Sequence, residues 1–127
     1  MSLPVPIKAY VITNVATGTV LTLSNQEWYF EEKEGGVVIL TKHQVKYLAV
    51  KGTPKSSAEI IAEDTHSPRV FSAQPGSTAG TFQILIKGTH FVLDLSHSDA
   101  AAGTPVIAYN NNKTNNQLWK AAAVENK

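Results

Sequence analysis

Apolar positions along the chain fall in short alternating or continuous runs, and clusters of Gly, Pro, Asn, Ser and Thr separate these runs. A period of two, bounded by turn residues, is typical of strands, whereas an amphipathic helix needs a period of 3.6. The stretch from Ser72 to Gly80 is the one candidate for a helix, and Pro75 and Gly76 favour a loop there instead. The pattern therefore predicts an all-β barrel or sandwich with strands at Ala9–Asn14, Thr19–Leu23, Glu27–Glu31, Val37–Thr41, Lys46–Val50, Glu59–Ala62, Val70–Ala73, Thr81–Ile86, Phe91–Leu95, Pro105–Tyr109 and Gln117–Ala121.

One unit recurs three times along the chain. Each copy opens with an apolar strand and continues with a strand in which Leu follows Val or Tyr, as in Val20–Leu23, Tyr47–Val50 and Val92–Leu95. The copies close on a marker position that is occupied by Trp28, Phe71 and Trp119 in turn. We expect a single domain, residues 1–127, with repeats at approximately 7–34, 35–78 and 79–124.

The first copy is shorter than the other two. The distance along the chain from Tyr10 to Gln26 is less than half of that from Phe82 to Gln117, although both pairs bracket the same part of the unit. We therefore expect one strand and its loop to be missing from the first repeat.

Composition narrows the class of protein. With 127 residues, of which 43% are hydrophobic, the chain is long enough for one core. The absence of cysteine excludes disulfides and thiolate metal sites, and it fits a reducing compartment. A net charge of +1, with scattered Lys and Arg, disfavours nucleic acid. Because no signal-like segment or membrane-spanning apolar run is evident, we expect a cytoplasmic protein without membrane insertion.

The order of these motifs resembles the ricin-B-type β-trefoil lectin family, whose repeats end in Gln-x-Trp. The resemblance covers nearly the whole chain and is most specific in the third unit, at Phe91–Ser96, Gly103–Tyr109 and Asn115–Trp119. It implies a β-trefoil of three repeats with a shortened first repeat, most like the small cytoplasmic lectins of mushrooms, and a defence role in a fungus. The structural repeat markers are then Gln26, Trp28, Phe71 and Trp119.

The same resemblance implies a carbohydrate site in the third repeat, for galactose, N-acetylgalactosamine (GalNAc) or related glycans. Asp94 would hold two vicinal hydroxyls, Tyr109 would stack on the sugar ring, and Asn116 would bond one of the same hydroxyls. Gln117 would orient the Asp94 carboxylate, and His97 would touch the ligand from the rim. A charged acceptor beside a flat apolar face is what a neutral sugar requires.

The other two repeats lack this set of residues. In the second, Ala49 takes the acidic position, Glu63 the stacking position and Arg69 the Gln position; in the first, Thr22 replaces the acid. We therefore expect one site per chain, with glycans as partners. A homodimer would be needed for cross-linking, and an exposed strand edge in the short repeat would favour one. Ile107 stands where many relatives carry a polar side chain, so specificity could differ from that of galactose-binding relatives.

Two alternatives stay open. The chain could be a β-trefoil protease inhibitor that presents the exposed loop Lys51–Ser57, or a non-binding trefoil that serves as a scaffold subunit. Catalysis is not expected, because the neighbours His97, Ser98 and Asp99 lack the convergence from separate segments that a triad needs. No metal or cofactor is expected either, since no histidine has a partner at metal-ligand spacing among His43, His66, His90 and His97.

Overall fold

The structure is a computed structural model that describes residues 9–21, 27–41, 46–64, 68–96, 106–112 and 114–123. Within these ranges the chain forms β-strands joined by turns, with 3-10 structure at η2 and at Ser96. The elements are β1 (Ala9–Asn14), β2 (Trp28–Lys33), β3 (Gly36–Thr41), β4 (Tyr47–Val50), β5 (Ile60–Glu63), β6 (Phe71–Pro75), β7 (Phe82–Ile86), β8 (Phe91–Leu95), β9 (Val106–Asn110), η2 (Asn115–Gln117) and β10 (Trp119–Ala123). None of the helical segments in this part of the chain is long and apolar enough to cross a membrane.

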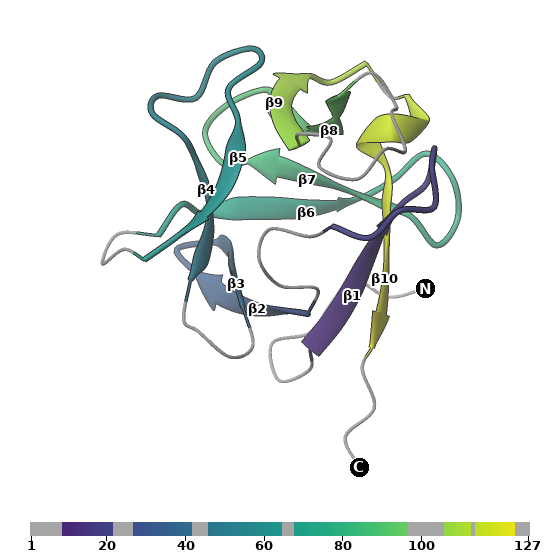
Figure 1. Ribbon diagram of the computed structural model, residues 1–127, viewed down its shortest axis with the longest axis horizontal. Coiled ribbons are helices and arrows are strands. Elements are labelled where there is room, and N and C mark those ends of the chain that lie inside the picture. Colours follow the sequence, from purple (N-terminus) through teal and green to yellow (C-terminus); the bar gives the residue numbers. More distant parts are fainter. Residues whose placement is uncertain are drawn as a thin grey trace.

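Six of the strands close into a barrel. Antiparallel pairing runs from β1 to β2, β3, β6, β7 and β10, and β10 pairs again with β1. Figure 1 shows β1 and β10, which lie at opposite ends of the sequence, side by side. Closure leaves the barrel strands with neighbours on both sides, which is how small β proteins avoid exposed sheet edges.

Two hairpins extend from the barrel strands. The β4–β5 hairpin joins the barrel through β3, and the β8–β9 hairpin joins it through β7 (Figure 1). At the corresponding place in the first repeat, the described residues contribute only a bridge between Thr13 and Val20. The fold is therefore the β-trefoil that the repeats predicted, with the first repeat shortened.

Three predictions differ from the observed elements. Strand β6 continues to Pro75, into the stretch from Ser72 to Gly80 that was expected to be a loop. The strand expected at Thr19–Leu23 is reduced to the bridge at Val20, and its end lies outside the described residues, as does the repeat marker Gln26. The strand expected from Gln117 begins at Trp119 instead. The preceding residues form η2, because the backbone N–H groups of Gln117 and Leu118 bond back to carbonyls three residues earlier.

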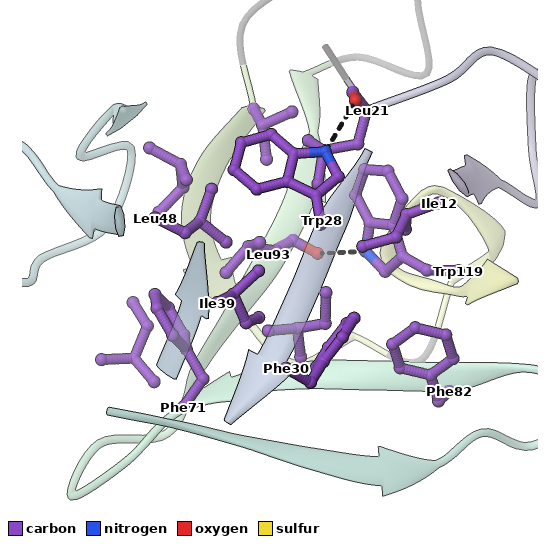
Figure 2. Packing of buried hydrophobic residues seen from close by; sticks show 14 of the residues in the cluster. Ile12, Leu21, Trp28, Phe30, Ile39, Leu48, Phe71, Phe82, Leu93 and Trp119 are labelled. Carbon is purple, nitrogen blue, oxygen red and sulfur yellow. Dashed lines mark hydrogen bonds between the residues drawn. The ribbon is translucent and has the colours of Figure 1, made fainter. Parts of the chain in front are cut away.

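The described repeat markers lie in the core. Trp28, Phe71 and Trp119 are almost completely buried. The indole N–H of Trp28 donates to the Leu21 carbonyl, and that of Trp119 donates to the Leu93 carbonyl, each at 3.2 Å (Figure 2). Leu21 and Leu93 occupy the same place in their repeats, so the two bonds are equivalent. They satisfy the polar group that a buried indole carries.

Aromatic rings from different repeats also meet inside the barrel. Phe30 of β2 and Phe82 of β7 pack edge to face, with ring centroids 6.4 Å apart and an interplanar angle of 72°. Figure 2 shows these rings together with Phe71 in one cluster. A single core therefore joins the three repeats, and this core supports the hairpins outside the barrel.

Candidate functional site

A pocket of about 620 Å³ lies over the β8–β9 hairpin and η2. Its position follows from the pairing of β8 with β9, in which Asp94 stands opposite Ile107. Partners that face each other across an antiparallel pair point to the same side of the sheet, so both reach the pocket while Leu93 and Ala108 face the core. The residues that line the pocket are Ser57, Asp94, Ser96, Ile107, Tyr109, Asn112, Thr114 and Asn116.

Two side-chain amides hold the Asp94 carboxylate. Asn116 Nδ2 donates to Asp94 Oδ1 at 3.0 Å, and Gln117 Nε2 donates to Asp94 Oδ2 at 2.9 Å. Asp94 lies on the outer face of the hairpin, but it is only 5% exposed because its partners cover it. The carboxylate is therefore fixed in place before any ligand arrives.

Gln117 ties this carboxylate to the backbone around it. Its Nε2 also donates to the Asn110 carbonyl at 2.7 Å, and its Oε1 accepts from the Asn112 N–H at 2.9 Å. The side chain is fully buried. This geometry fits the role that the resemblance implied for Gln117, which is to orient the Asp94 carboxylate. The same bonds also hold the segment that follows β9 in place.

Asn116 is held by the protein on both sides of its amide. Besides Asp94, its Nδ2 donates to the Leu95 carbonyl at 3.1 Å, and its Oδ1 accepts from Thr114 Oγ1 at 2.5 Å. An amide nitrogen carries two hydrogens, and both are used here. What Asn116 offers a ligand is therefore the second acceptor position on its oxygen, whereas its nitrogen serves mainly to position Asp94.

The first repeat contributes a residue that sequence reasoning missed. Asn14, at the end of β1, is 1% exposed, and its Nδ2 donates to the Asn116 carbonyl at 3.0 Å. The next residue, Val15, donates its N–H to the Leu118 carbonyl at 2.9 Å. The signal available in the sequence was an asparagine at an inward position of an otherwise apolar alternating strand, which needs a buried partner.

Of the two remaining predicted site residues, the structure describes Tyr109 but not His97. Tyr109 lines the pocket beside Asp94 and is partly exposed, as a stacking platform must be. His97 belongs to residues 97–105, which lie outside the described residues, so its place at the rim stays a prediction. Across the ranges that the structure describes, no group of three or more His, Asp or Glu side chains could hold a metal ion.

The corresponding region of the second repeat has different chemistry. A pocket of about 570 Å³ there is lined by Ala49, Glu63, Arg69 and Lys87 among others. The β4–β5 register puts Ala49 where Asp94 lies and Glu63 where Tyr109 lies. A methyl group thus replaces the carboxylate and a carboxylate replaces the ring, so these described residues do not repeat the network of the third repeat.

The loop Lys51–Ser57, the candidate for protease inhibition, is exposed apart from the partly buried Pro54. Its last residue is not free, because the Ser57 N–H donates to the Ala108 carbonyl of β9 at 2.7 Å. Ser57 also belongs to the lining of the third-repeat pocket. One end of this loop is therefore part of the candidate site.

Comparison with solved structures shows that the chain is similar to fungal lectins. The ricin B-like lectin of Macrolepiota procera, described in complex with lactose, is 25% identical, with a TM-score of 0.88 over 94% of this chain and 98% of that one. The agglutinin of Rhizoctonia solani is 27% identical, with a TM-score of 0.84 over 98% of this chain and 100% of that one. Both relatives match this chain over nearly their full length.

The fold by itself does not separate lectins from other β-trefoils. A proteinase inhibitor from Coprinopsis cinerea matches with a TM-score of 0.69 over 92% of this chain and 97% of that one, at 12% identity, which shows the fold alone. A search of curated proteins found no match. The family model described as "Ricin-type beta-trefoil lectin domain-like" matches residues 24–109, which is more than half of the sequence. The chain therefore belongs to the ricin-type β-trefoil lectin-like family.

Proposed function

We propose that the protein binds galactose, GalNAc or related terminal sugars through the pocket of the third repeat. Family membership and the likeness to fungal lectins support carbohydrate binding in general. The observation that carries the specific proposal is the Asp94 carboxylate, held by Asn116 and Gln117 in a pocket that also contains Tyr109. A defence role in a fungus is part of the same proposal and rests on the resemblance.

The network suits a vicinal diol. Each carboxylate oxygen has room for more than one hydrogen bond, so Asp94 accepts from ligand hydroxyls while its amide partners hold it. Such charge-assisted bonds are shorter and stronger than neutral ones. Because the acceptor is already oriented, binding costs little ordering of the protein. Tyr109 supplies the apolar face on which the C–H side of a sugar ring packs.

One relative supports a ligand of the galactose class, and one side chain of the pocket favours a less polar contact than other galactose-binding relatives offer. The Macrolepiota procera lectin is described with lactose, a galactose-terminated disaccharide. Ile107 faces the same pocket, next to Asp94, and supplies an apolar contact where a polar one would hold a further hydroxyl. We therefore expect lactose to bind, with the diol on Asp94 and a less polar face of the sugar on Ile107.

Binding without turnover fits the composition of the pocket. Hydrolysis of a glycoside generally needs two carboxyl groups, one as acid and one as base or nucleophile. Asp94 is the single carboxylate among the described residues that line this pocket. The protein is thus proposed to retain the sugar unchanged.

Calorimetric titration with lactose tests the proposal through Asp94→Asn. This change keeps the shape of the side chain and removes its charge, so affinity should fall on the order of ten- to a hundredfold, the value of charged hydrogen bonds. The matched control is Asp64→Asn, which makes the same change at an exposed acid outside the pocket lining and should bind like wild type. Thermal melting must show that both variants are folded.

Two results would contradict the proposal. Equal loss of affinity in both variants would mean that the change of net charge, and not the site, matters. Failure of folded wild type to bind lactose or any galactose- or GalNAc-terminated glycan on an array would remove the proposed function. Inhibition of a trypsin-like protease by that same non-binding protein would then favour the loop Lys51–Ser57.

A further inference from the structure

The second repeat reaches into the pocket of the third. The segment just before β5 runs beside β9, where Ala108 N–H donates to the Ala58 carbonyl at 2.8 Å and its carbonyl accepts from Ser57 N–H at 2.7 Å. Glu59 and Ile107 continue this ladder as an antiparallel bridge. These bonds fix the end of the β4–β5 hairpin against the strand that carries Ile107 and Tyr109.

The bonds place Ser57 on the far side of β9 from Asp94. Asp94 lies on β8, and Ser57 lies on the segment that adds to the opposite edge of β9. Adjacent strands are about 4.8 Å apart, so two spacings, about 10 Å, separate the backbones of β8 and the Ser57 segment. That span is wider than one sugar ring. The bridge pairs Glu59 with Ile107, so Ser57, which is bonded to Ala108, lies diagonally across β9 from Asp94. Asp94, Ile107 and Ser57 all line one pocket.

Ser57 also has an uncommon backbone conformation. Its φ is +70°, in the left-handed region that glycine adopts readily and other residues seldom do. A turn alone would be served better by glycine. The serine hydroxyl is thus presented at the pocket wall by a backbone that ladder bonds hold in place.

We propose that Ser57 recognises the second sugar of a bound glycan through a hydrogen bond from its hydroxyl. With the terminal sugar on Asp94 and Tyr109, the glycan continues diagonally across β9, and the Ser57 hydroxyl donates a hydrogen bond to the sugar next to the terminal one. This inference rests on the proposed function and adds a specificity residue that the second repeat supplies. The preferred ligand is accordingly a disaccharide or longer glycan, and the hairpin loop selects among glycans with the same terminal sugar.

The test compares lactose with methyl β-galactoside, which carries the terminal sugar alone. The variant is Ser57→Gly, which removes the hydroxyl and suits a φ of +70°, so the fold is retained. Ser56→Gly is the matched control, because Ser56 is an exposed neighbour that does not line the pocket. Ser57→Asn, which also tolerates this conformation but is larger, checks that the space beside Ser57 is occupied by the second sugar.

Wild type should bind lactose more tightly than methyl β-galactoside. Ser57→Gly should lower lactose affinity about two- to tenfold, the value of one neutral hydrogen bond, and leave methyl β-galactoside affinity unchanged. Ser57→Asn should weaken lactose alone, and Ser56→Gly neither ligand.

Three results overturn the inference while leaving the proposed function intact: equal affinity of wild type for both ligands, equal weakening of both by Ser57→Gly, or unchanged lactose binding in both Ser57 variants. If wild type binds neither ligand, the proposed galactoside site itself fails, and the Ser57 inference fails with it.

Discussion

Gln117 shows how one buried side chain can serve both fold and site. Its amide bonds the Asp94 carboxylate, the Asn110 carbonyl and the Asn112 N–H, all from within the buried interior of the third repeat. Loss of this side chain removes one of the two amide donors that hold the buried Asp94 carboxylate, and it removes the bonds that Gln117 makes to the Asn110 carbonyl and the Asn112 N–H. The Gln of the Gln-x-Trp ending is thus retained by this structure for reasons that do not depend on a ligand.

Gln117→Ala should therefore destabilise the protein and also weaken binding. We expect a loss of about 1–3 kcal/mol in the free energy of unfolding, measured by urea denaturation, because the buried Asp94 carboxylate loses one of its donors and two backbone groups lose the bonds from Gln117. The matched control is Gln74→Ala, since Gln74 is exposed and its side-chain amide donates to the Ser72 hydroxyl at the surface; it should change stability by less than about 0.5 kcal/mol. Equal stability of the two variants would contradict the structural part assigned to Gln117.

Sequence reasoning found the residues that contact one another within a repeat and missed those that act between repeats. Asp94, Asn116 and Gln117 belong to one motif, so their resemblance to a known pattern was enough to group them. Asn14 lies 102 residues from Asn116, and Ser57 is bonded to a strand of the next repeat. No local periodicity predicts such contacts, because they are set by how the barrel closes.

At the scale of elements, the regular strands were easier to predict than the segments between them. Strands β7 and β8 have apolar residues at every second position, and they were predicted to within one residue. The predicted start of β10 was wrong, because the 3-10 turn η2 before it is formed by backbone hydrogen bonds, which produce no periodic pattern of apolar residues in the sequence. The bridge at Val20 stands where a full strand was expected, and among the described residues of the first repeat Val20 pairs only with Thr13.

Substitutions of Trp119 test how much the packing of strand β10 in the core stabilises the barrel. Trp119→Ala should cost about 3–5 kcal/mol by cavity formation. Trp119→Phe should cost less, about 1–3 kcal/mol, because a ring is retained and mainly the bond to the Leu93 carbonyl is lost. Phe71, fully buried at the same place in the second repeat, shows that the barrel accommodates a phenyl ring. Urea denaturation of both variants measures this, and a near-neutral alanine variant would contradict the core packing.

At the scale of the whole molecule, three similar repeats carry unequal chemistry. The third has the held carboxylate, the second has Ala49 and Arg69 in the corresponding pocket, and the first is short. The two hairpins are not independent, because the ladder between Glu59 and Ile107 joins them beside the pocket. We therefore propose one binding site per chain, in which the third repeat binds the terminal sugar and Ser57 of the second repeat completes the wall of the pocket.

A titration of ¹⁵N-labelled protein with lactose, followed by NMR, tests the single third-repeat site most directly. We predict saturable shifts at the side-chain amides of Asn116 and Gln117 and at the backbone of Tyr109. The backbone of Ala49 and the side chain of Arg69 should stay unchanged, and calorimetry should give one lactose per chain. Shifts centred on Ala49 and Arg69, or no shifts in a folded protein, would contradict it.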